Sequence, residues 1–277
     1  MAVTAAVLCS AVLHATWNAL AKAVKDHLVG FVALNVGAGA VCLLIVPFVT
    51  APARRAWPFL ALSVVIHVAY QVMLLQSYRV GDLSQVYPVA RGTAPLLVAV
   101  LAVPLADERL GAVQLGGVIA IAAGLISLAQ LRAWRESGRP PALAFAFATG
   151  LLITGYSMVD GLGVRQADSA LGYAAWLVLI ESMSIPAYAV LTQRARVRRT
   201  WSTTWKLAGL GGVLSVTAYA IVLWAQTRGA LAAVTALRET GVIVAAVIGT
   251  VVFHEHFGRR RLVAAALVAG GVVLLNV

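Results

Sequence analysis

Residues 91–111 read RGTAPLLVAVLAVPLADERLG, and residues 238–258 repeat the pattern as RETGVIVAAVIGTVVFHEHFG. Each copy opens on Arg-x-Thr, runs through an apolar segment and closes on Glu-x-x-Gly. The offset of 147 residues holds as far as residues 125 and 272, and it becomes 148 slightly upstream, as a single deletion would explain. Because the polar anchors recur in register, we infer that the chain is a duplication of two related halves.

Apolar segments of this kind make up most of the 277 residues. Hydrophobic residues account for 61% of the chain and charged residues for 11%, against about 25% charged residues in soluble domains. This composition argues against a soluble globular enzyme. Ten segments approach the ~20 residues of a membrane-spanning helix. They are roughly residues 3–23, 29–50, 57–78, 83–104, 111–130, 142–162, 169–192, 205–227, 231–253 and 260–276.

Each half contains five spans, and this odd number makes the second copy enter the membrane in the opposite orientation. Inverted repeats recur in secondary transporters, which bind their substrate near the bilayer midplane between the halves. We therefore predict an all-α polytopic membrane protein with ten transmembrane helices in two inverted five-helix repeats. The repeats are residues 1–131 and 142–277, and residues 132–141, with their Gly and Pro residues, form the linker.

Basic residues outnumber acidic residues by 21 to 10. In a polytopic protein this excess reflects cytoplasmic loops, not a nucleic-acid partner. Fourteen basic residues follow odd-numbered spans and five follow even-numbered spans. Much of the difference comes from the run at residues 194–199, which we interpret as a cytoplasmic loop facing lipid. Both termini are therefore predicted to lie outside, in a multi-pass protein of a bacterial inner (plasma) membrane.

The segments 108–124 and 255–271 both begin with Glu-x-x-Gly and continue as a Gly-rich fifth span of their half. In these motifs and in its two five-span halves, the chain resembles the EamA type of the drug/metabolite transporter superfamily. The resemblance covers essentially the whole chain. It implies ten helices, alternating access around a central cavity and, as in many relatives, export of small metabolites.

Polar side chains inside the spans recur at helical spacing, so they share helix faces. Such side chains are costly in a bilayer and normally face the bundle interior or a wet cavity. Some Ser and Thr positions are explained by interhelical hydrogen bonds alone. His67 and Asp160 lie on the same polar stripes as the candidates. The predicted solute-binding residues are His14, Trp17, Asn18, Tyr70, Gln71, Tyr87, Arg91, Tyr156, Trp176, Glu181, Tyr188, Tyr219, Arg238 and Glu239.

Arg91 and Arg238 are the strongest single signal. Each lies about eight residues, or about 12 Å, into its span, and the hydrocarbon half-thickness is about 15 Å. Both are therefore expected near the midplane, where a guanidinium can bind a carboxylate or phosphate bidentately. The alternative is that Glu181 or Glu239 neutralises them and locks helices together. For Arg91, solute binding and helix locking are equally supported by the sequence. For Arg238, helix locking is favoured because Glu239 is its neighbour.

Two further features of these spans bear on transport. Pro88 and Pro95 bracket Arg91, and each can loosen the helix locally, which predicts a broken helix at the transport site. Glu181 is a candidate for proton coupling, although a salt bridge to an arginine is slightly preferred. His14 and His67 could relay protons, or they could simply be hydrogen-bonded in the interior.

Other motifs argue against a catalytic or metal-dependent protein. Cys9 and Cys42 lie in apolar spans and predict neither a disulfide nor a metal site. His254 and His256 lack the i, i+4 spacing of zinc ligands. There is no Walker motif and no convincing nucleophile set, so we predict no ATP-driven transport, no cofactor and no enzymatic activity.

Taken together, the pattern predicts a secondary active transporter that exports a small organic metabolite with an anionic or zwitterionic group. One alternative is proton-coupled efflux of cationic or lipophilic compounds, with Glu181 or Glu239 exchanging the proton. The alternative from another class is a membrane-embedded enzyme. The predicted partners are the solute, membrane lipids and, in the coupled case, protons. Substrate identity, direction, coupling ion and oligomeric state do not follow from the sequence.

Overall fold

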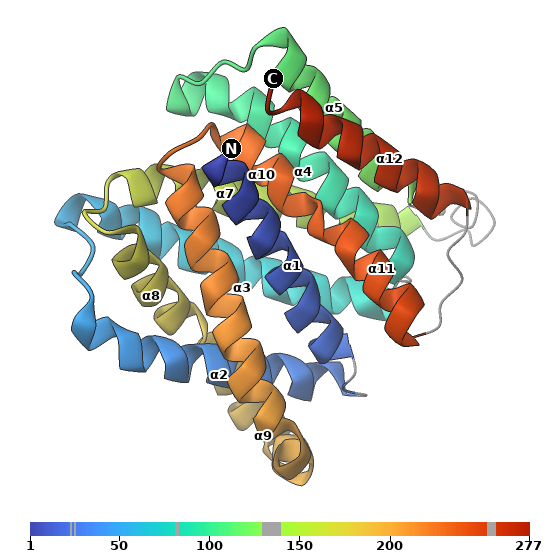
Figure 1. The fold of residues 1–277 in the computed structure, drawn as a ribbon. Helices are drawn as coiled ribbons and strands as arrows, with labels where there is room; N and C mark the ends of the chain where they lie inside the picture. The colour runs from blue at the N-terminus through green and yellow to red at the C-terminus, as the bar shows by residue number, and fades with distance from the viewer. Residues whose placement is uncertain (23, 25, 81–82, 129–139, 254–258) are drawn as a thin grey trace.

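The regular elements of the described chain are all helical (Figure 1). The computed structural model describes residues 1–277 except 23, 25, 81–82, 129–139 and 254–258. The helices of the first half are α1 (Ala2–Lys22), α2 (His27–Ile45), α3 (Trp57–Val80), α4 (Leu83–Ala106) and α5 (Ala112–Ser127), with 3₁₀ turns at Val46–Phe48 and Arg54–Ala56. Those of the second half are α7 (Pro140–Arg165), α8 (Ala170–Glu181), α9 (Ser184–Gln226), α10 (Leu231–Glu239), α11 (Gly241–Phe253) and α12 (Arg259–Leu274).

Within the described residues, seven segments are long and apolar enough to cross a membrane. Two further apolar helices, α5 and α12, have 16 residues each. Two predicted spans are broken: the seventh is divided between α8 and the start of α9, and the ninth is divided into α10 and α11. The described residues are thus all-helical and the protein is a multi-pass membrane protein, while a count of ten crossings stays a prediction.

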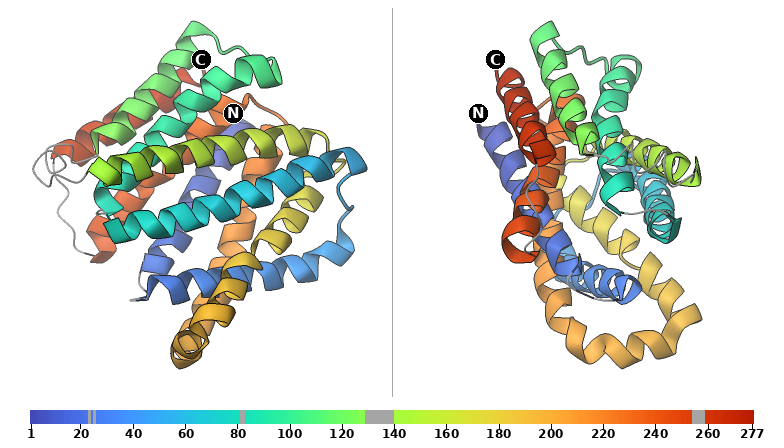
Figure 2. Two further views of the ribbon diagram at one scale, coloured as in Figure 1. Left: turned by 180° about the vertical axis from the view of Figure 1, so that it is seen from behind. Right: turned by 90° about the vertical axis from the view of Figure 1, so that its right-hand side faces the viewer.

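The predicted loop around residues 194–199 is helical instead. Helix α9 contains 43 residues, and the backbone departs from helical angles only at Gln193 (φ −137°, ψ 29°). The stretch from residue 187 to 208 contains neither Gly nor Pro, and Arg and Lys are good helix formers. Figure 2 shows α9 leaving the helical body and bending back toward it. Two helical segments therefore meet at a kink at Gln193, and the basic run 194–199 lies within the second of them.

Helices α5 and α12 cross closely and run antiparallel. Gly117 of α5 faces Gly271, and Gly124, seven residues later, faces Ala264, which precedes Gly271 by seven residues. A Cβ atom at Gly117 would lie 2.8 Å from the Gly271 carbonyl oxygen, and one at Gly271 would lie 2.7 Å from the Gly117 oxygen. The missing side chains therefore allow backbone-to-backbone contact, as in other close helix crossings within membranes.

Both termini lie on the same side of the molecule (Figure 1). The Thr4 hydroxyl donates to Asn276 Oδ1 at 2.5 Å, which joins the start of α1 to the end of the chain. An even number of membrane crossings requires such an arrangement. Arg55 and Asp168 are 3.6 Å apart on the same face and join the segments that precede α3 and α8.

Glu108 and Arg165 hold three further segments together. Arg165 Nη2 lies 2.6 Å from Glu108 Oε1, and its guanidinium also donates to the carbonyl oxygens of Gln226 and Gly229. The other Glu108 oxygen accepts the backbone N–H of Leu231 at 2.7 Å, at the first turn of α10. A carboxylate is stabilising at a helix N-terminus, so Glu108 both caps α10 and anchors the end of α7.

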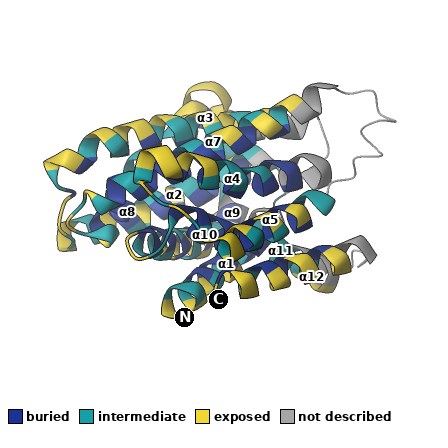
Figure 3. Cartoon of the chain, turned by 90° about the horizontal axis from the view of Figure 1, so that it is seen from above, coloured by how far each residue is buried: buried dark blue, intermediate teal, exposed yellow. Residues whose placement is uncertain are grey.

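Many large apolar side chains are exposed on the outside of the bundle, and Figure 3 marks the exposed residues of the helices in yellow. Leu43, Leu62 and Val65 are each more than half exposed although they are large aliphatic residues. The buried set, in contrast, includes charged residues such as Arg91, Asp160 and Glu239. This inside-out distribution is that of a helix bundle that faces lipid and encloses polar groups.

Candidate functional site

A cavity of about 150 Å³ lies among the helices of both halves. Its wall is formed by α1, α2, α3, α4, α7, α8, α9 and α10. The lining residues are His14, Trp17, Asn18, Phe31, Leu34, Asn35, Ala38, His67, Tyr70, Gln71, Arg91, Tyr156, Val178, Glu181, Ser182, Ser215, Ala218, Tyr219, Val222 and Arg238.

Most of the solute-binding residues predicted from the sequence lie together in this wall. Those that line the cavity are His14, Trp17, Asn18, Tyr70, Gln71, Arg91, Tyr156, Glu181, Tyr219 and Arg238. Trp176 instead packs edge-on against Trp57, with ring centroids 5.5 Å apart, and Tyr188 is half exposed on α9. Glu239 lies behind the wall. The side chain of Tyr87 is outside the described part of the structure.

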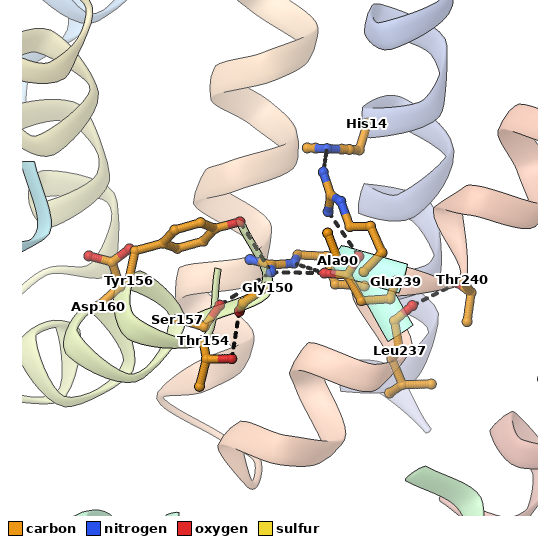
Figure 4. A network of polar contacts seen from close by, with 12 residues as sticks. His14, Ala90, Gly150, Thr154, Tyr156, Ser157, Asp160, Leu237, Glu239 and Thr240 are labelled. Atoms are coloured by element: carbon orange, nitrogen blue, oxygen red, sulfur yellow. Dashed lines mark hydrogen bonds and ion pairs between the residues drawn. The ribbon is translucent and has the colours of Figure 1, made fainter. Parts of the chain in front are cut away.

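Arg91, Arg238 and Glu239 form a buried cluster beside the cavity (Figure 4). Arg91 Nη1 lies 2.9 Å from Glu239 Oε2, and Arg238 Nη2 lies 2.9 Å from Glu239 Oε1. Each carboxylate oxygen therefore serves one guanidinium, and the three side chains together carry a net charge of +1. Because both arginines line the cavity and the carboxylate does not, the positive charge faces the cavity.

Both guanidiniums also contact other helices. Arg91 Nη2 lies 3.2 Å from His14 Nε2, and since a guanidinium only donates, His14 accepts through this nitrogen. Arg238 Nη2 contacts the Ser157 hydroxyl at 3.2 Å and the Tyr156 hydroxyl at 3.4 Å. The cluster thus connects α1, α4, α7 and α10, and it supports the structural role that the sequence offered as an alternative.

Glu181 does not form the preferred salt bridge with an arginine. Its described contact is with Gln71, whose amide nitrogen donates to Glu181 Oε1 at 2.6 Å. The prediction failed because Glu239, the other available carboxylate, already bridges both guanidiniums. Glu181 therefore contributes a carboxyl group, hydrogen-bonded to Gln71, to the same cavity whose wall holds the two arginines.

Two buried polar atoms of the wall have no hydrogen-bond partner among the described residues. They are Trp17 Nε1, a donor, and Gln71 Oε1, an acceptor. A buried polar group normally has a partner, because leaving it unsatisfied costs about 1–3 kcal/mol. Since both residues line the cavity, these atoms are candidates for hydrogen bonds to a solute or to water within it.

Helix breaks place polar side chains at the cavity. They do not lie beside the prolines of α4, where a break was predicted. Helix α4 is continuous from Leu83 to Ala106 despite Pro88 and Pro95, so the predicted break beside Arg91 was wrong. The break occurs in the second half, where α10 ends at Glu239 and the Thr240 hydroxyl caps the carbonyl of Leu237. Packing of α4 against its neighbours evidently outweighs the loss of the two proline donors.

Some residues of the wall, among them Asn35 and Ser182, were not predicted from the sequence. An Asn within the apolar span 29–50 was a usable signal, because polar residues there are costly. Asn35 and Ser182 are also separated by 147 residues, the offset of the duplication. The apolar wall residues Phe31, Leu34 and Val178 could not be predicted, because the lipid-facing positions of the spans are apolar as well.

The fold and the cavity define a class of protein, a polytopic helical membrane protein with a polar cavity between its helices. The sequence model described as the EamA-like transporter family matches residues 2–130 and again residues 140–277. The chain therefore belongs to the EamA family, within the drug/metabolite transporter superfamily, as the repeated motifs predicted.

The fold is also that of proteins of known structure. A crystal structure with 20% sequence identity superposes with a TM-score of 0.77, covering 100% of this chain and 99% of the other. A search of curated proteins finds no match to this sequence. At that identity the structural likeness establishes the fold alone, so the solute has to be inferred from the cavity.

Proposed function

We propose that this protein is a secondary active transporter that exports a small zwitterionic metabolite, such as an amino acid, by alternating access. The observation that carries the proposal is the pairing of charges in the cavity wall. Arg91 and Arg238 share a single carboxylate and leave one positive charge at the cavity, and Glu181 supplies a carboxyl group that an ammonium group would hold in its ionised form. A carboxylate would bind at the guanidiniums and an ammonium group at Glu181.

The size of the cavity supports a small solute. Drug-sized ligands occupy pockets of about 300–1,000 Å³, whereas a cavity of about 150 Å³ accommodates a molecule such as benzene. The cavity here falls in the second class at about 150 Å³. A solute of roughly six to ten non-hydrogen atoms therefore fits.

The mode of transport is inferred from the relation between the halves. At the offset of 147, Gly117 corresponds to Ala264 and Gly124 corresponds to Gly271. The contacts Gly117–Gly271 and Gly124–Ala264 are therefore equivalent, and the two helices run antiparallel. A twofold axis in the membrane plane produces such a pattern, which supports inverted repeats of residues 1–131 and 142–277 that rock around the cavity.

A ligand-stabilisation screen on the purified protein tests the proposed solute. The probes are valine, isovalerate, which lacks the amino group, and isobutylamine, which lacks the carboxylate. A ligand at 100 times its Kd adds about 2.7 kcal/mol to the free energy of unfolding, so binding is visible in the melting temperature. We expect valine to stabilise the protein more than either analogue.

Flux in proteoliposomes then tests the transport of any stabilising probe. The second candidate function, proton-coupled efflux of cations, rests on Glu181 as a carboxylate in the cavity wall. Tetramethylammonium, a permanent cation small enough for the cavity, is its probe. Stabilisation by this cation, with no response to valine or isovalerate, would refute the zwitterion proposal and favour cation efflux.

A further inference from the structure

Gln71 of α3 places an unpaired acceptor beside the carboxyl group of Glu181 on α8. Gln71 Nε2 donates to Glu181 Oε1 at 2.6 Å, so the amide nitrogen is the atom turned toward the carboxyl group. Gln71 is 6% exposed, and the other atom of its amide, Oε1, has no hydrogen-bond partner among the described residues. An amide oxygen only accepts hydrogen bonds, and leaving it buried and unpaired is unfavourable. A donor bound next to Glu181 would satisfy it.

Asn35 of α2 supplies a further acceptor in the same cavity wall. Its Nδ2 donates to the carbonyl oxygen of Phe31, four residues earlier, at 2.9 Å. Because that carbonyl only accepts, the nitrogen must face it, and Oδ1 is directed away from it. No described residue donates to Asn35 Oδ1. Since Asn35 lines the cavity, this oxygen is available to a solute.

The packing of α2 on α8 places Asn35 in the part of the wall that contains Glu181. Gly39 follows Asn35 by about one turn and shares its face of α2. A Cβ atom at Gly39 would lie 2.5 Å from Ser182 Oγ, so α2 meets α8 closely there. Ser182 directly follows Glu181 and lines the cavity with it. Helix α3 also packs on α8, so three neighbouring helices contribute the three acceptors.

Strong donors of the wall come from other helices. Arg91 and Arg238 belong to α4 and α10. Trp17 belongs to α1, and its Nε1 is a buried donor without a partner among the described residues. Helix α1 packs mainly on α9, α10 and α11. Donors for a carboxylate and acceptors for an ammonium group are therefore contributed by different sets of helices.

We propose that Glu181, Gln71 and Asn35 form a subsite for a primary ammonium group and make the transporter selective for amino acids without N-methyl groups. A primary ammonium group has three N–H donors. Glu181 Oε2, Gln71 Oε1 and Asn35 Oδ1 are its three acceptors, and the carboxylate adds the opposite charge. Each N-methyl group removes one donor and leaves one acceptor unpaired. That the ammonium belongs to an amino acid rests on the proposed function, whereas its recognition by three oxygens does not.

A methylation series of valine tests the subsite with the full chain in lipid nanodiscs. Valine, N-methylvaline and N,N-dimethylvaline all keep the carboxylate and the positive charge, but they have three, two and one N–H donors on the nitrogen. We expect the Kd to rise about tenfold for the first methyl group and further for the second, because a hydrogen bond is lost each time. Equal Kd values across the series would overturn the subsite and leave the proposed solute in place.

Asn35→Leu separates the loss of a hydrogen bond from simple crowding by the methyl group. Leucine is similar in size but has no acceptor, so this variant should bind valine and N-methylvaline equally well. Asn18→Leu is the matched control, because Asn18 also lines the cavity and donates to a carbonyl four residues earlier, that of His14. It lies on α1 and should keep the preference for valine. A preference that survives in folded Asn35→Leu, or is lost in Asn18→Leu, would overturn the assignment. The wild-type series decides the question if Asn35→Leu does not fold.

Isobutylamine and N,N-dimethylisobutylamine separate failure of the subsite from failure of the proposed function, because neither contains a carboxylate. Thermal stabilisation by isobutylamine and not by its dimethyl form, with no response to valine, would refute the zwitterionic solute and support the subsite. No response to any of these amines and amino acids would overturn both. Sodium chloride is the control for an inorganic cation, and stabilisation by sodium equal to that by isobutylamine would also overturn the subsite.

Discussion

At the scale of single residues, the ion pairs of Glu239 explain why Arg91 can be buried. Arg91 comes from the first half, and Arg238 and Glu239 come from the second. The side chain of Glu239 is fully buried, and those of both arginines are 5% exposed. Removing one partner from such a cluster lowers the stability of the fold by more than the ion pair contributes to it, because the remaining charge stays buried.

Glu239→Gln should therefore be the most destabilising substitution of the cluster. It leaves two guanidiniums without a counter-charge, and breaking a buried ion pair costs about 3–5 kcal/mol. Thermal unfolding in nanodiscs measures the effect. The control is Asn18→Ala, a polar-to-apolar change in the same cavity wall. Gln71→Glu would not be a suitable control, because it adds a charge. A Glu239→Gln variant as stable as wild type would contradict the central role of Glu239.

Arg91→Lys separates binding from folding. Lysine keeps the positive charge next to Glu239, but it loses the planar fork that binds a carboxylate at two points. We expect a folded variant whose Kd for an anionic or zwitterionic probe rises about tenfold, which corresponds to about 1.4 kcal/mol. Titration of valine against wild type and variant gives the comparison. Equal affinities in two folded proteins would exclude Arg91 as a solute contact.

At the scale of elements, small residues determine how closely the halves approach. The contact of α5 with α12 uses Gly117 and Gly271, whose backbones meet directly. The neighbouring glycines, Gly116 and Gly270, point into space that is empty within 4 Å. Each helix therefore contains a pair of adjacent glycines of which packing requires one, Gly117 or Gly271, and not the other.

These adjacent pairs make a controlled experiment. Gly271→Ala and Gly117→Ala place a methyl group against backbone and should lower the free energy of unfolding by about 1–3 kcal/mol. Gly270→Ala and Gly116→Ala should be neutral or stabilising by up to about 1 kcal/mol, because alanine is the better helix former. Thermal unfolding of the four variants tests this. Similar effects within a pair would show that the helices do not cross as described.

At the scale of the whole molecule, the distribution of charge predicts the orientation in the membrane. The face with both termini carries few basic residues, and two of them, Arg55 and Arg165, are paired with acids of that face. The bend of α9, near the basic run 194–199, protrudes from the body in Figure 2. Positive charge is retained on the cytoplasmic side, so we expect both termini to lie outside.

Topology reporters at the C-terminus measure this orientation directly. In a bacterial host, a reporter that requires export should be active and one that requires the cytoplasm should not. Replacing the basic residues of 194–199 with glutamine removes much of the asymmetry and should produce a mixed orientation. A wild-type C-terminal reporter that is active only in the cytoplasm would show that the charge rule fails for this chain.

Much of the fold could be predicted from the sequence, because the membrane imposes a strong and local constraint. Apolar segments of about 20 residues are expected to span, and backbone polar groups there must bond within the helix. The duplication and its polar anchors also predicted the family. Local composition could not predict where helices break: Pro88 and Pro95 do not interrupt α4, whereas the seventh span breaks after Glu181 and the ninth breaks at Thr240.

For the site, the sequence alone determined which polar residues must face inward, since polar side chains are costly in lipid. That principle selected Arg91, Glu181 and Arg238 together with most of the polar cavity wall. Only the tertiary structure decided which charges meet. Glu239 lies 148 residues from Arg91, so their pairing depends on how α10 packs on α4. Helical periodicity gives the direction of a side chain on its own helix, but long-range partners are set by the packing of helices from both halves.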